Sequence, residues 1–491
     1  MDNRFNKQWE SKKVAFLTLG CKVNSYETEA MQKLFEEEGL AVVDFSERAD
    51  IYVINTCTVT NIADRKSRQM LHKAKKMNES ALVVAVGCYV QASKEALEQD
   101  AAVDVVIGNN KKKDIISILK EHLYGNTSKE SQDEFNISDF SEELEYEELN
   151  IDAVSEKTRA YIKIQDGCNQ FCSYCIIPYA RGRIRSRAKV SVIAEVKRLV
   201  EKGYKEIVLT GIHLSSYGLE KSRLVQHRTE ELELSQSRTE QIGTEQTDTV
   251  QNRTEELELS QLDHPLLNLI IDLNKIEGLE RVRLGSLEPR IITENFAKTL
   301  SAMDKFCPHF HLSLQSGCDE TLKRMNRRYN STEYYEKCVL LRKYFDNPAI
   351  TTDVIVGFPG ENEEEFRTTE EFLKKVSFAQ MHIFKYSKRQ GTKAAAMDNQ
   401  VKEEEKAFRS NVLIALGEEL TKKYQDSFVG NIEKVLFEET VCIDGVNYQV
   451  GHNEKYQKLA VIEEKDLTNS ICSVLVKQQI NKEIMFCEIM D

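Results

Sequence analysis

Residues 161–175 read YIKIQDGCNQFCSYC, in which a predicted β-strand runs directly into three closely spaced cysteines. Cys168, Cys172 and Cys175 have the spacing CxxxCxxC, and three thiolates within eight residues can bind one metal centre. A structural zinc site usually takes four protein ligands, and no fourth Cys or His lies nearby. Three cysteines on a four-iron cluster instead leave one iron open for a non-protein ligand. The spacing therefore favours an iron–sulfur centre over structural zinc or three unrelated thiols.

Strands and helices alternate on both sides of this stretch. The predicted strands from Ala160 onward are YIKIQDG, EIVLTG, RVRLGS, HFHLSLQ, AITTDVIVGF and AQMHIFKY. Six strands with intervening helices predict a partial or complete parallel β/α barrel over residues 158–400. Residues 220–262 interrupt the pattern, because RTEELELSQ occurs twice, at 228–236 and 253–261. We interpret this segment as a polar insertion in a βα loop, where insertions are tolerated.

Residues 12–124 also alternate between helices and unbroken Val/Ile-rich strands, which predicts an open parallel sheet covered on both faces. Three of these strands, VAFLTLG, DIYVINT and ALVVAVG, end directly before Cys21, Cys57 and Cys88. The carboxyl ends of parallel strands share one edge, so these thiols can converge on a second metal centre. The alternative is that each cysteine is a small buried hydrophobic residue.

The remaining segments complete the predicted architecture. Residues 125–157 are acidic and lack periodicity, which predicts a linker. A charged helix is expected over residues 402–424, and short strands separated by turns then predict a small all-β barrel over 425–491. The expected fold class is α/β, with an N-terminal open parallel α/β domain, a central partial β/α barrel and a C-terminal all-β barrel.

Charge and composition leave an RNA partner open. The net charge is −13, but residues 129–157 and 220–262 contribute −9 and −5, so the other residues are close to neutral. No apolar run approaches the roughly 18–20 residues of a membrane span, and the polar N-terminus does not resemble a secretory signal. Twelve cysteines in such a chain favour reduced thiols over disulfides. We therefore expect a cytoplasmic protein without a membrane partner.

Basic residues alternate just after the three closely spaced cysteines. They are Arg181, Arg183, Arg185, Arg187 and Lys189. In an extended segment they would share one face and could form a track for phosphate groups. The alternatives are a solvated edge and internal salt bridges.

With Tyr174 before its last cysteine, the CxxxCxxC motif resembles that of the radical S-adenosylmethionine (SAM) enzymes. The resemblance implies that Cys168, Cys172 and Cys175 hold a 4Fe–4S cluster whose open iron binds SAM. Reductive cleavage of SAM then yields a 5′-deoxyadenosyl radical. The resemblance also implies a SAM pocket at the strand ends, although each of its residues could instead be a cap or turn residue. These residues are Gly211, Ser286, Glu288 and Gln315.

Further motifs resemble those of the methylthiotransferases, from about residue 12 to 425 outside the linker and the insertion. The resemblance implies that Cys21, Cys57 and Cys88 hold an auxiliary 4Fe–4S cluster that supplies or carries sulfur. The C-terminal barrel resembles the TRAM domain, an RNA-binding module. The motifs are LGCKVNSYETE (Leu19–Glu29), NTCTVT (Asn55–Thr60), VGCYVQ (Val86–Gln91), RIRSR (Arg183–Arg187), LTGIHLSSYG (Leu209–Gly218), SLEP (Ser286–Pro289), HLSLQSG (His311–Gly317), RMNRRY (Arg324–Tyr329) and TDVIVGFPGE (Thr352–Glu361).

Within this family, LGCKVNSYETEAM with RMNRRY is most similar to the tRNA N6-threonylcarbamoyladenosine C2-methylthiotransferases. This implies methylthiolation of that nucleoside at position 37, beside the anticodon, with the tRNA anticodon loop, a low-potential electron donor and a sulfur source as partners. The alternatives are isopentenyladenosine in tRNA, a ribosomal protein, or a non-catalytic iron–sulfur RNA-binding protein. Two departures are the duplicated insertion and Ser313, where the family often has proline.

Overall fold

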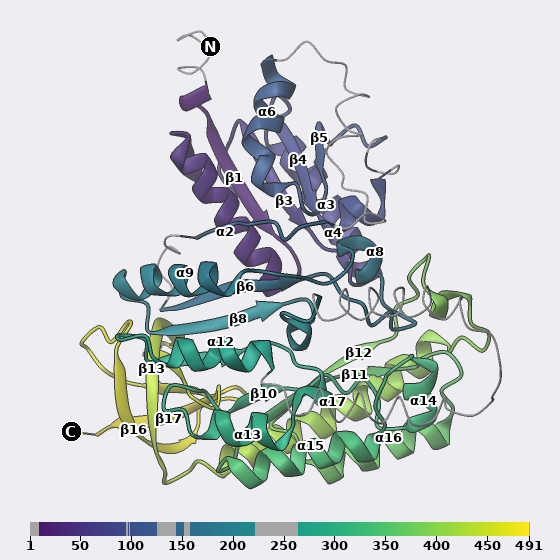
Figure 1. Ribbon diagram of the computed structural model, residues 1–491, viewed down its shortest axis with the longest axis vertical. Helices are drawn as coiled ribbons and strands as arrows, with labels where there is room; N and C mark the ends of the chain where they lie inside the picture. Colours follow the sequence, from purple (N-terminus) through teal and green to yellow (C-terminus); the bar gives the residue numbers. More distant parts are fainter. Residues whose placement is uncertain are drawn as a thin grey trace, which may run out of the picture.

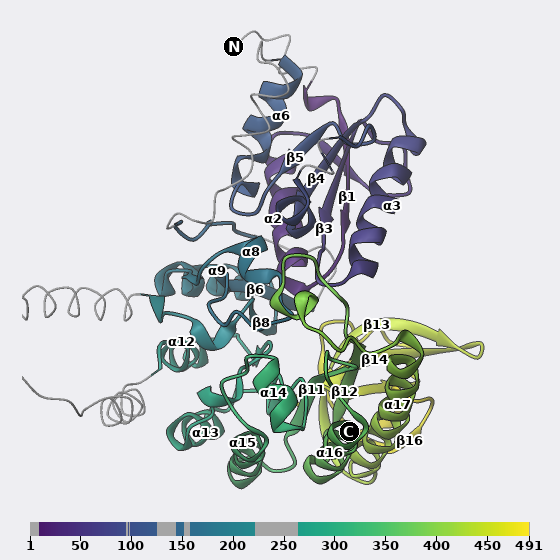
Figure 2. The same cartoon turned by 90° about the vertical axis from the view of Figure 1, so that its right-hand side faces the viewer.

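The computed structural model describes residues 9–94, 97, 99–124, 144–151, 158–220 and 264–490. Three units follow one another along the chain (Figure 1). The N-terminal sheet lies at one end of the molecule, the central sheets lie next to it, and the C-terminal barrel packs against the central part (Figure 2). The predicted insertion lies outside the described residues except for Glu220.

The N-terminal unit is a five-stranded parallel sheet in the order β2-β1-β3-β4-β5. Apolar residues on both faces of its strands pack against helices, with α2 and α6 on one face and α3 on the other. The open parallel α/β architecture is as predicted, but edge strand β2 has only three residues and was not predicted. The elements are β1 (Lys13–Thr18), α2 (Lys22–Glu37), β2 (Ala41–Val43), β3 (Ile51–Thr56), α3 (Asn61–Met77), β4 (Leu82–Gly87), α4 (Cys88–Ala92), β5 (Val105–Ile107) and α6 (Ile115–Tyr124).

The central unit is a partial barrel. One sheet has the order β7-β6-β8-β9 and the other β10-β11-β12. Isolated parallel bridges, Val282 to Phe306 and Leu287 to Leu312, join β9 to β10. The six predicted strands therefore follow one another around the barrel. They are β6 (Arg159–Asp166), β8 (Glu206–Gly211), β9 (Arg281–Leu284), β10 (His309–His311), β11 (Ala349–Val356) and β12 (Gln380–Lys385), with β7 (Arg185–Ser186) antiparallel at one edge.

Helices cover the outer face of the partial barrel and bury its largest hydrophobic core. Ile162 and Ile164 of β6, Ile207 and Leu209 of β8, and Phe310 of β10 belong to this core. Because side chains alternate along a strand, the intervening residues face the barrel interior. The covering helices are α9 (Lys189–Glu201), α12 (Pro265–Asn274), α13 (Glu294–Ser301), α14 (Asp319–Arg324), α15 (Ser331–Tyr344), α16 (Glu363–Val376) and α17 (Glu403–Asp426), whereas the short α8 (Ile177–Arg181) packs beside α4 of the N-terminal unit.

The C-terminal unit is a closed barrel in the order β13-β14-β15-β17-β16, as expected for a small all-β domain. Its pairings are antiparallel except that of β15 with β17. Within the described residues, no helix combines the length and apolar character needed to cross a membrane. The strands are β13 (Ile432–Ile443), β14 (Val446–Asn453), β15 (Lys458–Val461), β16 (Ile471–Gln479) and β17 (Ile484–Ile489).

The described part of the predicted linker, residues 144–151, forms neither helix nor strand but is partly buried. Leu149 and Ile151 join the core of the central unit. The Glu147 carboxylate accepts a hydrogen bond from the Lys113 backbone of the N-terminal unit at 2.9 Å. The Tyr146 hydroxyl donates to the Lys163 carbonyl at 2.8 Å. This segment therefore connects the two units by direct contacts.

Candidate active site: two groups of three cysteines

Cys21, Cys57 and Cys88 lie at the carboxyl edge of the N-terminal sheet. Cys21 is the N-cap residue of α2, Cys57 follows β3, and Cys88 begins α4. Gly20 has φ +99°, and a Cβ there would lie 2.7 Å from the Cys57 Sγ, so only glycine allows this approach. Burial raises the pKa of Cys57 to about 11, and the charges of Cys88 and Cys21 add to the increase. The three thiols are thus electrostatic neighbours, as ligands of one metal centre must be.

Cys168, Cys172 and Cys175 form a tight loop after β6. Gly167 precedes the loop with φ +70°, and a Cβ there would lie 1.8 Å from the Arg183 carbonyl oxygen. Burial raises the pKa of Cys168 to about 11 and that of Cys175 to about 12, and the nearby Cys172 thiol contributes to both. Both groups of thiols fit a cationic iron–sulfur cluster, because such a centre stabilises the thiolates that burial disfavours.

Arginines that the sequence analysis did not assign surround this loop. Arg327 donates a hydrogen bond to the Cys172 Sγ at 3.2 Å. Burial, together with the charges of Arg327, Arg290 and Arg328, lowers the pKa of His213 to about 4. The motif RMNRRY contained this signal, since it supplies two of the three arginines.

The structure places Gly211 and Glu288 close to the cysteine loop. A Cβ on Gly211 would lie 2.9 Å from Gln165, whose side-chain oxygen accepts a hydrogen bond from the His213 backbone at 2.7 Å. The Nε2 atom of His213 in turn lies 3.3 Å from the side-chain nitrogen Nε2 of Gln170, in the cysteine loop. Burial raises the pKa of Tyr329 above its ordinary value, and Glu288 and Cys172 both contribute, so one ring lies near both groups.

Ser286 and Gln315 lie at strand ends, as the sequence predicts. Ser286 is exposed after β9. Gln315 is buried with φ +73°, and its backbone hydrogen-bonds to Asp353 and Ile355 along β11. The described contacts fix the backbone of Gln315 rather than directing its side chain to the cysteines, so a role in SAM binding stays a prediction for both residues.

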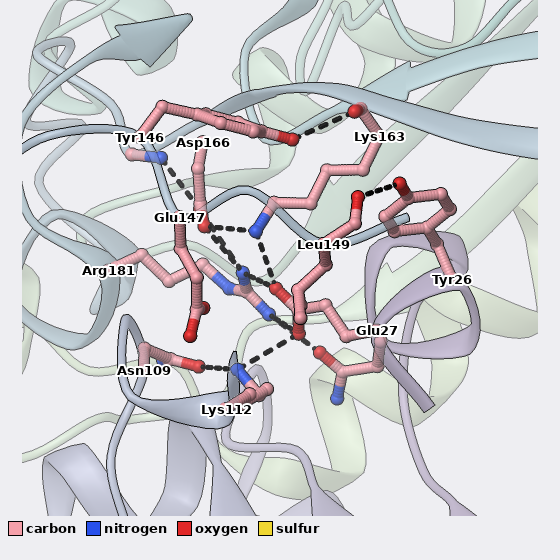
Figure 3. A network of polar contacts seen from close by, with 12 residues as sticks. Tyr26, Glu27, Asn109, Lys112, Tyr146, Glu147, Leu149, Lys163, Asp166 and Arg181 are labelled. Carbon is pink, nitrogen blue, oxygen red and sulfur yellow. Dashed lines mark hydrogen bonds and ion pairs between the residues drawn. The ribbon is translucent and has the colours of Figure 1, made fainter. Parts of the chain in front are cut away.

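A buried network of charged side chains lies between the two groups of cysteines, and Figure 3 shows its centre, where Arg181 lies between Asp166 and Glu27. Arg181 of α8 donates to the Cys88 Sγ at 3.1 Å, to Glu27 of α2 at 2.9 Å and to Asp166 at 3.1 Å. Asp166 ends β6, two residues before Cys168. Lys163 bonds to Glu27 at 2.7 Å and to Asp166 at 2.6 Å. Both carboxylates therefore hold the N-terminal sheet against the cysteine loop.

The buried side chains of this network carry more positive than negative charge. Burial by itself raises the pKa of Glu27, but Arg181, Lys112 and Lys163 outweigh it and hold the pKa well below the usual range. Lys112 lies 3.0 Å from Glu27 and is fully buried. With Arg185, which lies 3.7 Å from Asp166, four buried cations thus face three buried carboxylates, those of Glu27, Asp166 and Glu147 (Figure 3). This excess positive charge beside Cys88 suits a thiolate that binds metal.

The predicted phosphate track is wrong, and internal salt bridges explain the alternating arginines. Arg181 belongs to a helix rather than to an extended segment, and Arg181, Arg185 and Arg187 are buried. Arg187 pairs with Glu195 and with Glu148. Within the run of arginines, only Arg183 is exposed, and its guanidinium lies 4.7 Å from the centre of the Phe171 ring.

The interior of the partial barrel is lined by polar side chains that the sequence analysis missed. On three neighbouring strands, ligand atoms of His311, Asp353 and His382 lie within 4.8 Å of one another. Other interior residues are Tyr161 on β6, Glu206 on β8, Arg283 on β9 and His309 on β10. Their signals in the sequence were the period-two alternation of polar and apolar residues and, for His311 and Asp353, their places in HLSLQSG and TDVIVGFPGE.

Comparison with known proteins matches two family models to this chain. The model described as uncharacterized protein family UPF0004 matches residues 13–108, and that of the radical SAM superfamily matches residues 162–373. Two curated relatives are threonylcarbamoyladenosine tRNA methylthiotransferases MtaB. That of Bacillus subtilis (strain 168) is 38% identical, over 94% of this chain and 93% of the relative. That of Aquifex aeolicus (strain VF5) is 36% identical, over 91% of this chain and 98% of the relative.

A third relative carries a different name. The tRNA-2-methylthio-N(6)-dimethylallyladenosine synthase of Clostridium botulinum (strain Hall) is 31% identical over 94% of this chain and 93% of the relative. These similarities extend over all three structural units. With two groups of three cysteines in one molecule, the chain belongs to the radical SAM tRNA methylthiotransferases, enzymes that carry two 4Fe–4S clusters and use SAM.

Proposed function

We propose that this enzyme adds a methylthio group to C2 of N6-threonylcarbamoyladenosine at position 37 of tRNA, giving 2-methylthio-N6-threonylcarbamoyladenosine. The observation that carries the proposal is the Arg181 network, which ties Cys88 to the strand that leads into Cys168. Such a reaction needs a sulfur-bearing centre held at a fixed position relative to the centre that binds SAM. The choice of substrate is supported by two relatives named for threonylcarbamoyladenosine at 36–38% identity, whereas a third relative of that name and the dimethylallyladenosine synthases are 31–32% identical.

In this proposal, Cys168, Cys172 and Cys175 hold the cluster that binds SAM, and Cys21, Cys57 and Cys88 hold the auxiliary cluster. When bound, these groups supply a carbon-centred radical and the sulfur. A radical route suits the substrate, because the hydrogen on C2 of adenine is neither acidic nor on a carbon with a good leaving group. Acid–base side chains alone would therefore not functionalise this position.

The residues of this chain have supporting tasks. Arg327 holds the Cys172 thiolate by a hydrogen bond, and Arg181 does the same for Cys88. Gly211 and Glu288, with Ser286 and Gln315, surround the space in which we place SAM. The Glu288 carboxylate is itself bound by Arg290 at 2.9 Å. Together these contacts orient both groups of ligands and exclude water from their buried sides.

We assign tRNA binding to the C-terminal barrel, since small β-barrels present strands and loops to unstacked nucleotides. The anticodon loop is then the part of the tRNA that reaches the central unit. A low-potential electron donor and a sulfur source complete the reaction, and we place the enzyme in the cytoplasm. If the substrate were isopentenyladenosine instead, the assignments of the barrel, the electron donor, the sulfur source and the location would stay the same.

Mass spectrometry of tRNA nucleosides from cells with and without this gene tests the proposal. We expect 2-methylthio-N6-threonylcarbamoyladenosine to disappear without the gene, and to return with the wild type but not with Cys172→Ala. Cys442→Ala is a matched control, because Cys442 is an exposed cysteine of β13 and should restore the nucleoside. An unchanged nucleoside in the deleted cells would contradict the proposed substrate, and loss of the methylthio isopentenyl nucleoside would identify the other one.

A further inference from the structure

Lys22, the first residue of α2, directly follows Cys21 and reaches toward the interior of the partial barrel. Its Nζ lies 4.8 Å from the centre of the Tyr161 ring on β6 and 5.6 Å from that of Tyr456 in the C-terminal barrel. Lys22 is nevertheless exposed, so space for solvent remains beside it. One ammonium group of the N-terminal unit thus contacts a side chain from each of the two other units, and no ion pair within the described residues includes it.

The surroundings of Lys22 add to its positive field. The guanidinium groups of Arg159 and Arg283 lie 5.1 Å and 4.8 Å from the centre of the Tyr456 ring. Unlike Lys22, these arginines have acidic partners: Arg159 pairs with Glu438 at 2.6 Å, and Arg283 with Glu206 at 2.8 Å.

The pKa of the Tyr456 hydroxyl reflects the positive charges around its ring. Burial alone raises the pKa of its hydroxyl, but the charges of Arg159, Lys22 and Arg283 outweigh burial, so the pKa is lowered. A neutral phenol becomes easier to ionise only where the local potential favours negative charge. Lys22, Arg159 and Arg283 thus gather around one ring, and this arrangement of three cations suits an anionic group.

We propose that Lys22 binds the carboxylate of the threonylcarbamoyl group and thereby selects this nucleoside, an inference that rests on the proposed function. In adenine, C2 and C6 flank N1, so the substituent on N6 lies on the side of the base next to the reacting carbon. A residue that binds this substituent must therefore stand close to the sulfur-bearing cluster. Lys22 meets this condition, because it is the chain neighbour of Cys21.

The same side chain acts against the other nucleoside. A dimethylallyl group is apolar, and placing it against an ammonium group would remove water from the charge without supplying an acceptor. The rings of Tyr161 and Tyr456 hold the ammonium in place by cation–π contacts and leave its remaining donors for the carboxylate. Selection thus combines attraction of one substituent with a penalty for the other.

The test compares two RNA stem–loops that differ only in the carboxylate. One carries N6-threonylcarbamoyladenosine and the other carries its threoninol analogue, in which CH2OH replaces the carboxylate. Affinities of the iron-loaded protein are measured without SAM by fluorescence anisotropy. The wild type should bind the carboxylate RNA about 10–100-fold more tightly, as expected for hydrogen bonds to a charged group. Lys22→Met should bind both RNAs equally, at the affinity of the wild type for the analogue.

Matched variants separate recognition from folding. Lys33→Met changes a lysine of the same helix that pairs with Glu37, and should keep the wild-type preference. Lys22→Arg should keep part of it, and iron content equal to that of the wild type shows that Lys22→Met is intact. A preference retained by Lys22→Met, or one absent from the wild type, would overturn the assignment of Lys22. The proposed function fails separately, if the wild type forms no methylthio product from the threonylcarbamoyl RNA.

Discussion

The two groups of cysteines differ in how the chain brings them together. Cys168, Cys172 and Cys175 lie in one loop of eight residues, so local backbone geometry sets their positions. Cys21, Cys57 and Cys88 come from three strand ends, and only the parallel sheet makes them neighbours. The loop is therefore a local motif, whereas the strand-end group depends on tertiary structure and on the Arg181 network.

The largest expected effect on stability comes from that network. Arg181→Met leaves Glu27 and Asp166 buried with fewer cations, and removal of one partner from a buried ion network costs about 3–5 kcal/mol. Arg183→Met is the control, because the exposed Arg183 guanidinium packs on Phe171 and its loss should cost less than about 1 kcal/mol. Denaturant unfolding of both variants measures the difference. Equal stability of the two variants would contradict a structural role for the network.

Two glycines, one beside each group of cysteines, differ in how tightly the chain packs around them. At Gly167 a Cβ would meet the Arg183 carbonyl oxygen at 1.8 Å, and this backbone atom cannot move without disrupting the loop. At Gly20 a Cβ would meet the Cys57 Sγ at 2.7 Å and the Cys57 Cβ at 2.8 Å, so the Cys57 side chain must shift, but the nearest atoms all belong to side chains. Positive φ alone costs about 1–3 kcal/mol for alanine, so both variants lose stability, and Gly167→Ala should lose more.

Unfolding measurements rank the two glycine variants, and iron analysis combined with formation of 5′-deoxyadenosine from SAM shows which cluster each one loses. Gly167→Ala should lose the iron of the cysteine loop, whereas Gly20→Ala should weaken only the strand-end group. Loss of more stability in Gly20→Ala than in Gly167→Ala would show that the sheet edge, not the loop, is the more rigid of the two.

A smaller effect should appear as pH is lowered. The pKa of His213, beside the cysteine loop, is about 4 in the folded chain, below the value near 6.5 expected when unfolded. Between these values the unfolded chain binds more protons, so stability falls as pH decreases from about 6.5 to 4, by about 1–3 kcal/mol. Glu27 has its pKa held below the usual range for a carboxyl, so its contribution is lost only in more acidic solution.

The free energy of unfolding, measured at pH 7 and at pH 5, tests whether His213 causes this loss of stability. His213→Gln should show a weaker loss of stability between the two pH values than the wild type. An identical loss in both proteins would show that His213 is not the group that titrates.

Local patterns in the sequence predicted most of the fold. The six strands of the barrel, the parallel N-terminal sheet and the C-terminal barrel were each visible as runs of apolar or alternating residues. The three-residue strand β2 was missed because so short a segment has no measurable period. The loop cysteines needed only their spacing, and the strand-end cysteines needed only the rule that parallel strands share a carboxyl edge.

Long-range contacts explain what the sequence analysis got wrong or missed. The alternating arginines appeared extended and exposed by period alone, but Glu27 and Asp166 draw Arg181 into the interior. Lys22 lies in the motif LGCKVNSYETEAM, but the motif does not reveal its surroundings, because Tyr161 and Tyr456 belong to other structural units. A charged side chain is buried where it finds partners far along the chain, and the periodicity of a short stretch does not reveal these partners.

The most direct test of separate roles for the two groups of cysteines uses the iron-loaded enzyme, SAM, a reductant and a stem–loop carrying N6-threonylcarbamoyladenosine. Formation of 5′-deoxyadenosine and of methylthio product is measured for the wild type, Cys21→Ala and Cys172→Ala. We predict that Cys21→Ala still forms 5′-deoxyadenosine but no methylthio product, whereas Cys172→Ala forms neither. Methylthio product from Cys21→Ala would contradict the assignment of the sulfur-bearing cluster to the strand-end cysteines.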